Sequence, residues 1–371
     1  MAYTTVDDPT QYFNTVLFTG DIEDSDGTGH DQAVTGVGFQ PNWIWHKCRS
    51  HANQHILVDS VRGTGGSPTQ MIGLTSQGTG AEVNSNTNGW IESIDSDGFT
   101  VTSGNDSSSK SNNAGANGRT YVDWCWKAET AFSNDASSTS IGTIDSSGSA
   151  NQTAGISICS YTGNQTSGAT IKHGLSTAPK TIFIKKRSAG DHWTVLTQTI
   201  SLNTHLHLSQ NNGAISDPMF TNTAPTTSVF TVDSDGQVNG NNDTFIAYCF
   251  SPIKGYSKFG KYTGNGNVDG PFIYTGFRPA WVMTKRTDSA GDWAMMDNKR
   301  PNEFNVVQNY LKGQAGDAEQ TDDSFNIDMC ATGFKCRYNN GNYNADGGAY
   351  VYWAFAEVPT VNSNGAPANA R

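Results

Sequence analysis

Short apolar runs bounded by Gly, Asn, Asp and Pro recur along the whole chain. The runs are rich in Val, Ile, Trp, Phe and Tyr, as at 43–45, 181–184 and 281–283. β-Branched and aromatic residues in short runs between turn formers predict β-strands. The sequence has no long window with an apolar face at helical spacing, so we predict an all-β protein.

Three sequence phrases follow one another in the same order three times along the chain. The first is an aromatic residue followed by Thr-Gly, the second is an apolar run ending in lysine, and the third is a strand of aromatic residues. The first phrase begins at 18, 161 and 262, the second ends at Lys47, Lys185 and Lys285, and the third occupies 121–126, 245–250 and 350–355. A repeat of about 100 residues predicts duplicated domains rather than a short-period solenoid.

We therefore expect three tandem homologous modules, each an antiparallel β-sandwich of the jelly-roll or lectin-like type. Turn signals such as Ser-Asp-Gly and Asn-Gly recur at hairpin-like intervals, which favours sandwiches over a parallel β-helix. The expected bounds are 1–132 for the first module with its N-terminal segment, 154–254 for the second and 255–359 for the third. Small polar residues dominate 133–153 and 360–371, so we predict a polar linker and a polar tail there.

The aromatic strands alternate between two sets of side chains, as Tyr350 and Tyr352 alternate with Val351 and Trp353. Successive residues of a strand point to opposite faces of its sheet. One set is therefore expected in the core of its own module, and the other against a neighbouring module or subunit.

The lysines that end the repeated run, Lys47, Lys185 and Lys285, are the first candidate binding residues. Each could clamp a carboxylate of its own module, contact a neighbouring module or bind a ligand. Trp193 and Trp293 follow two of these lysines closely, and an aromatic rim at this place would suit stacking on a sugar. Packing in the core is the expected use of both tryptophans.

Aspartates gather in turn sequences, and their oxygens could bind calcium. Short side chains in such turns usually bond their own backbone, and the ligand spacing of an EF-hand is missing. We therefore expect no metal and no other cofactor, with calcium as a weak alternative. The calcium candidates are Asp95, Asp97, Asp233 and Asp235, with Asp24 and Asp26 as further ones.

His205 and His207 alternate along a predicted strand and therefore face the same side. They could act as metal ligands, but we expect a solvated or subunit-facing pair. The sequence contains no Gly-x-Ser-x-Gly elbow, no Walker loop and no HExxH motif, so we predict that the protein is not an enzyme. Two opposed glycosidase carboxylates are the alternative that 34 acidic residues leave open.

The charge balance bears on the partners of the protein. A net charge of −11, from 23 basic and 34 acidic residues, argues against a nucleic-acid partner. No apolar run approaches the roughly 18 residues that a membrane span needs, and the N-terminus does not resemble a signal peptide. We therefore expect neither membrane insertion nor export. The six cysteines include no CxxC pair, which argues for reduced thiols without zinc.

Five longer phrases, spread over most of the chain, carry a resemblance to a known family. They occupy 7–15, 36–49, 59–63, 255–260 and 269–279. Together they resemble virion proteins of tailed marine phages and cyanophages, built of repeated lectin-like β-sandwich domains. The resemblance implies a virion component made in the host cytoplasm, and it supplies no catalytic residue.

From this resemblance we expect a phage structural protein, a tail fibre or adhesin that attaches the particle to a glycan of the host surface. The expected partners are other virion proteins, a host glycan and further copies of the chain, with a trimer favoured. A capsid or tail decoration protein that stabilises the particle without binding a receptor is the main alternative. An enzyme that degrades polysaccharide is a further one.

Overall fold

The structure is a computed structural model that describes residues 3–23, 30–66, 69–84, 88–104, 113–300, 305–321 and 324–367. In these residues the chain is nearly all β, which confirms the predicted all-β class with antiparallel sheets. The described helical segments are single turns: η1 (Pro9–Gln11), α1 (Ala136–Thr139) and α2 (Gly236–Asn239). Asp24 and Asp26 lie outside the described residues.

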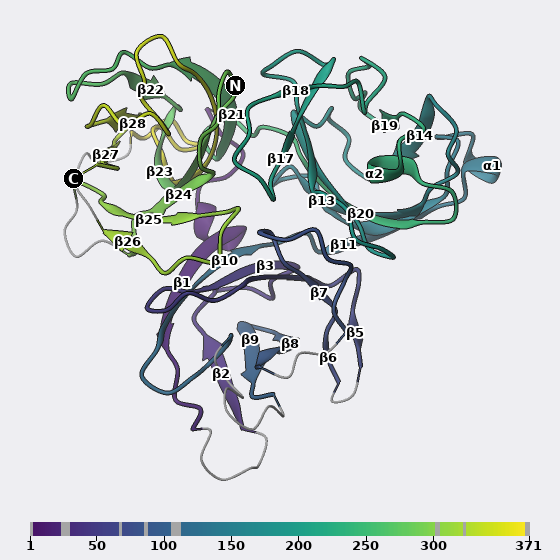
Figure 1. Cartoon of the computed structure of the whole chain (residues 1–371), viewed down its shortest axis with the longest axis horizontal. Coiled ribbons are helices and arrows are strands. Elements are labelled where there is room, and N and C mark those ends of the chain that lie inside the picture. The colour runs from purple at the N-terminus through teal and green to yellow at the C-terminus, as the bar shows by residue number, and fades with distance from the viewer. Residues whose placement is uncertain are drawn as a thin grey trace.

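The strands form three groups, which Figure 1 shows side by side around a common centre. We name them the first unit (β1–β10), the second unit (β11–β20) and the third unit (β21–β29). In each unit a five-strand arrangement recurs: β1-β10-β3-β4-β7, β13-β20-β15-β16-β17 and β21-β29-β23-β24-β25. A smaller sheet packs on it in each unit: β2-β9-β8, β14-β19 and β22-β28-β27. The module bounds expected from the sequence remain a prediction.

The strands of the first unit are β1 (Phe13–Thr19), β2 (Asp31–Thr35), β3 (Trp43–Cys48), β4 (His55–Asp59), β5 (Thr64–Gly65), β6 (Gln70–Met71), β7 (Gly73–Leu74), β8 (Trp90–Asp95), β9 (Gly98–Thr102) and β10 (Thr120–Trp126). Those of the second unit are β11 (Thr130–Asn134), β12 (Ser146–Asn151), β13 (Ile156–Thr162), β14 (Ala169–Lys172), β15 (Thr181–Lys186), β16 (Thr194–Thr197), β17 (Thr204–His207), β18 (Ile215–Ser216), β19 (Val229–Val232) and β20 (Thr244–Phe250). Those of the third unit are β21 (Ser257–Thr263), β22 (Phe272–Tyr274), β23 (Phe277–Arg286), β24 (Ala294–Asp297), β25 (Asn309–Lys312), β26 (Gln320–Thr321), β27 (Ile327–Cys330), β28 (Gly333–Cys336) and β29 (Ala349–Pro359).

Each aromatic strand serves two cores, as its alternation predicts. In β29, Tyr352 and Ala354 face the sandwich interior of the third unit, whereas Val351, Trp353 and Phe355 face a core shared by all three units. Strands β10 and β20 divide their side chains in the same way. The aromatic members of this shared core are Phe13, Trp43, Trp45, Trp124, Trp126, Phe183, Trp193, Tyr248, Phe250, Tyr256, Phe259, Trp281, Trp293, Trp353 and Phe355.

Ring contacts join the units across the shared core. Trp43 of the first unit stacks on Tyr248 of the second with ring centroids 4.5 Å apart. Phe355 of the third unit lies 5.7 Å from Trp126 and 6.0 Å from Phe250. Burying one large apolar side chain stabilises a fold by about 1.5–3 kcal/mol, so the three units stabilise one another.

The structure corrects the prediction that 133–153 is a linker. Strand β12 pairs with both β11 and β13, and it extends the main sheet of the second unit. Asp135 caps the turn α1 between them by accepting a hydrogen bond from the backbone N–H of Ser138 at 3.0 Å. A strand is held by its backbone hydrogen bonds to the neighbouring strands, so a composition of Ser, Gly and Asn does not prevent pairing.

Candidate functional site

The three repeated lysines hold the units together. All three are fully buried, and each donates from Nζ to a backbone carbonyl of the neighbouring unit. Lys47 reaches Gly316 O at 3.2 Å, Lys185 reaches Thr79 O at 3.1 Å and Lys285 reaches Asn211 O at 3.0 Å. The contacts run from the first unit to the third, from the second to the first and from the third to the second. They form a closed head-to-tail ring within one chain.

Burial changes the protonation of these lysines. Desolvation lowers the pKa of Lys47 and of Lys185 to about 8, and that of Lys285 to about 7. Nearby carboxylates such as Asp317 and Asp292 oppose the shift but do not cancel it. The lysines are therefore structural donors, and the hypothesis that they bind a ligand is wrong for this structure.

Trp193 and Trp293 are also fully buried, so they do not form a sugar-stacking rim. Their indole N–H groups donate hydrogen bonds across the same boundaries between units as the lysines do. Trp193 Nε1 donates to Thr75 O at 2.9 Å, and Trp293 Nε1 donates to His207 O at 2.9 Å. His55 takes this place in the first unit, where its Nε2 lies 3.1 Å from Lys312 O. Core packing, the expected use of both tryptophans, is what the structure shows.

Backbone pairs and ion pairs reinforce the ring. At each boundary, the backbone carbonyl of the residue two positions after the repeated lysine accepts a hydrogen bond from the neighbouring unit. The donors are the backbone N–H groups of Glu319, Glu82 and Ala214, at 2.7, 3.0 and 2.8 Å. Arg49 binds Glu319 through two hydrogen bonds of 3.0 and 2.9 Å. Arg187 binds Glu82 in the same way, with Nε 2.7 Å from Oε2. The third boundary has Ala214 in place of the glutamate and lacks this ion pair.

A buried Asp–Arg pair recurs in two of the three units. Asp59 accepts from Arg62 Nε at 2.6 Å and from the Tyr248 hydroxyl of the second unit at 2.6 Å. In the third unit, Asp297 accepts from Arg300 Nε at 2.6 Å and from Trp124 Nε1 of the first unit at 3.0 Å. The carboxylates are thus paired and hydrogen-bonded, as buried charges must be.

The second unit has Thr197 at the strand position that Asp59 and Asp297 occupy in the others. The aromatic residue that corresponds to Tyr248 and Trp124 is Trp353, and its buried Nε1 has no hydrogen-bond partner in the described structure. An indole N–H is a donor only, so its missing partner follows from the missing carboxylate.

The four weak calcium candidates are occupied by local hydrogen bonds. Asp97 accepts from the backbone N–H of Gly38, and Asp235 caps α2 by accepting from Gln237 N at 2.7 Å. Asp95 accepts from Thr100 Oγ1 at 2.8 Å, and Asp233 accepts from Ser234 N at 2.7 Å. Among the described residues, no three His, Cys, Asp or Glu side chains stand together at metal-binding geometry.

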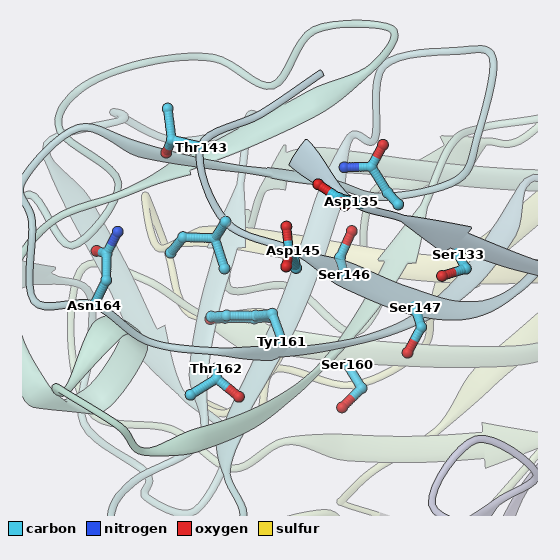
Figure 2. Close-up of a pocket in the computed structure, with 12 residues that line it drawn as sticks. Ser133, Asp135, Thr143, Asp145, Ser146, Ser147, Ser160, Tyr161, Thr162 and Asn164 are labelled. Atoms are coloured by element: carbon cyan, nitrogen blue, oxygen red, sulfur yellow. The ribbon is translucent and has the colours of Figure 1, made fainter. Parts of the chain in front are cut away.

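A polar hollow of about 600 Å³ lies in the second unit, between β11, the N-cap of α1, β12 and β13. Its lining is dominated by hydroxyl, carboxylate and amide groups, which Figure 2 shows gathered around Asp145 and Ser146. The hollow is lined by Ser133, Asn134, Asp135, Thr143, Ile144, Asp145, Ser146, Ser147, Ser160, Tyr161, Thr162 and Asn164. It exists because β11 and β12 extend this sheet, so the segment predicted to be a linker builds it.

The walls of the hollow are fixed by backbone contacts. Asp145 accepts from the N–H of Ala136 at 2.8 Å, and Thr143 Oγ1 accepts from the N–H of Thr170 at 2.8 Å. The ring of Tyr161 is buried below, with its hydroxyl donating to Val238 O at 2.6 Å. Ser147 and Thr162, at the rim, are exposed. The hollow is therefore a preformed surface of hydrogen-bonding groups without an exposed aromatic face.

Sequence reasoning missed this hollow. Ser147 belongs to the stretch whose composition resembles a linker and Ser160 to the strand that follows it, and only the pairing of β12 with β13 brings the two serines opposite each other. The one available signal was Asp135 followed by Ser137 and Ser138, a helix-capping sequence that marks ordered structure.

Fold and site together define an all-β protein of antiparallel sandwich units closed around a shared core. The chain belongs to the family described as Domain of unknown function (DUF7483), which matches residues 8–359. The match runs across all three units as one domain, in agreement with the core that they share. No curated protein and no solved structure matches the chain. None of the described helices is long and apolar enough to cross a membrane.

Proposed function

We propose that this chain is a structural protein of a phage particle and that the hollow of the second unit attaches it to a glycan of the host surface. The observation that carries the proposal is the chemistry of the hollow. Hydroxyl and amide groups both donate and accept hydrogen bonds, and carboxylates accept them, which complements the hydroxyl groups of a sugar. A volume of about 600 Å³ suits a few sugar rings. The phage setting rests on the sequence resemblance.

The proposed site binds without catalysis. A glycosidase needs a carboxylic acid whose pKa is raised so that it can protonate the leaving group. At Asp135 the opposite holds, because hydrogen bonds from Ser137 and Ser138 lower the pKa of its carboxyl group. Asp135 therefore does not suit the role of this acid, which is the reason to propose an adhesin before an enzyme that degrades polysaccharide.

Binding to an array of bacterial surface polysaccharides tests the proposal. Thr162→Arg places a long side chain at the rim of the hollow, and Thr263→Arg makes the same change at the corresponding position of β21 in the third unit, where both threonines are exposed. We expect saturable binding by the wild-type chain, at least tenfold weaker binding by Thr162→Arg and unchanged binding by Thr263→Arg. Binding that survives Thr162→Arg would refute the assignment of the hollow.

A decoration protein that binds other virion proteins is the second candidate, and a specific observation favours it. Phe272 and Tyr274 on β22 are 48% and 54% exposed, and Val268, four residues before Phe272 in the chain, is 57% exposed. Exposed apolar side chains gathered in one place are typical of a protein-contact surface. A chain that binds no glycan but binds phage particles, and loses that binding in Phe272→Ser/Tyr274→Ser, would support this candidate instead. Assembly into a trimer is part of the same proposal and is measured by light scattering.

A further inference from the structure

A cluster of three histidines lies in the second unit, away from the polar hollow and independent of the proposed function. His205 and His207 are on β17 and are 1% and 6% exposed, so the expectation of a solvated pair is wrong. His192, just before β16, stacks on His207 with ring centroids 4.4 Å apart. The cluster therefore occupies an interior position.

The corresponding positions of the other units are filled by different chemistry. In the three main sheets, Leu74, Leu206 and Leu311 pair with corresponding residues of the neighbouring strand. The residues that precede these leucines therefore also correspond, and they are Gly73, His205 and Tyr310. A side chain at Gly73 would collide with the ring of Trp90, and Tyr310 stacks on Phe325 at 4.3 Å. Aromatic packing thus serves the first and third units, whereas the second unit has buried imidazoles.

Hydrogen bonds indicate which ring nitrogens carry protons. Nδ1 of His205 lies 3.1 Å from the backbone carbonyl of Asp217, which only accepts, so this nitrogen carries a proton. Nδ1 of His207 lies 3.3 Å from Oε1 of Gln210, and Nε2 of the same amide lies 3.2 Å from Nε2 of His192. With Gln210 in this orientation, Nδ1 of His207 is protonated as well.

The remaining two nitrogens then face each other as acceptors. Nε2 of His205 and Nε2 of His207 are 3.1 Å apart, and in the neutral rings both carry lone pairs. Two facing lone pairs repel unless a proton or a metal ion lies between them, and Gln237 makes a further side-chain hydrogen bond to His207.

We propose that His205 and His207 bind a divalent transition-metal ion of the zinc class through their Nε2 atoms. Zinc lies about 2.0–2.1 Å from imidazole nitrogen, which in a tetrahedral site holds two ligands roughly 3.3 Å apart. The observed 3.1 Å is close to this spacing. Both Nδ1 groups contact an oxygen acceptor, the arrangement that orients metal-binding histidines. Two protein ligands are fewer than the four of a structural zinc site, so we expect the ion to be exchangeable.

Metal titration of the full chain, purified without a histidine tag and stripped with EDTA, tests the proposal. We expect one Zn²⁺ per chain by calorimetry, a raised unfolding temperature and visible absorption bands on substitution with Co²⁺. The double variant His205→Gln/His207→Gln should lose the binding, and Gln210→Leu should weaken it by about 10–100-fold through loss of the orienting contact. His51→Gln, at an exposed histidine of the first unit, should bind as the wild type does.

Two results would overturn the proposal. The first is a wild-type chain that takes up no stoichiometric Zn²⁺. This is the result expected if the Gln210 amide is turned over, so that Nε2 of His207 carries the proton and donates to His205. The second is binding that persists in the folded double variant, as judged by its circular dichroism. The wild-type measurement decides even where a variant does not fold.

Discussion

The buried carboxylate of Asp59 provides a test of how the units are held together. Tyr248 of the second unit donates its hydroxyl to Asp59 Oδ2 at 2.6 Å and accepts from Arg62 Nη2 at 2.9 Å. Burial raises the pKa of Tyr248, which keeps the hydroxyl protonated and able to donate. Tyr248→Phe removes the oxygen alone and leaves the ring stacked on Trp43.

The expected cost can be worked out from these contacts. A hydrogen bond to a charged group contributes about 1.5–3 kcal/mol, and removing one partner leaves the charged group under-solvated. Tyr248→Phe should therefore lower the free energy of unfolding by about 1.5–3 kcal/mol. Urea denaturation followed by tryptophan fluorescence measures this change, because eight of the nine tryptophans lie in the shared core.

Tyr256→Phe is the matched control. Tyr256 belongs to the same shared core and is also fully buried, but its hydroxyl has no hydrogen-bond partner in the described structure. Removing a buried hydroxyl without a partner should be neutral or stabilising. If Tyr256→Phe costs as much as Tyr248→Phe, or if Tyr248→Phe costs less than about 0.5 kcal/mol, the contact between the units does not contribute as argued.

Three further predictions concern the same framework. Thr197→Asp combined with Ile200→Arg gives the second unit the missing ion pair, and it gives the indole N–H of Trp353 an acceptor. The double variant should raise the free energy of unfolding in urea by about 1 kcal/mol, whereas Thr197→Asp alone should lower it. Burial lowers the pKa of Lys285 to about 7, so the unfolded state binds more protons above that pH. Stability therefore gains a rising contribution above about pH 7, and Lys285→Met should remove the part of this rise between about pH 7 and 8, below the pKa of Lys47 and Lys185, in urea midpoints measured from about pH 6 to 9. Gly148→Val collides with the carbonyl of Ile158 and should release β12, seen as proteolysis within 133–153 and lost glycan binding.

The strands and the two-sided aromatic pattern could be predicted because both depend on local sequence. Trp353 and Ala354 are neighbours in the chain, and strand geometry alone sends them to different cores. The lysines could be recognised as a repeated position, and contact with a neighbouring module was among the alternatives. Their acceptors could not be predicted, because Gly316 and Thr79 lie in loops and contribute only backbone oxygen.

The polar hollow was harder to predict from the sequence, because it also depends on backbone pairing. Polar residues near 133–153 carry no apolar periodicity, and the register of β12 on β13 is set by backbone pairing. The tryptophans considered for sugar stacking are buried instead. Trp193 has the composition of a sugar-stacking residue, but a ring of this size contributes most when it is buried, and its N–H found a partner in the neighbouring unit.

Because the ring closes within one chain, the contacts at the boundaries must recur in every unit, whereas other parts of each unit can differ. In a ring of identical subunits, any insertion appears at every position. Here the lysine and backbone contacts recur at all three boundaries, while the strands β11 and β12 and the histidine cluster occur in the second unit. The aromatic faces that suggested a partner subunit are buried against one another in the shared core. A trimer of chains would therefore need a different surface, and the exposed face of β22 is the place where we expect it.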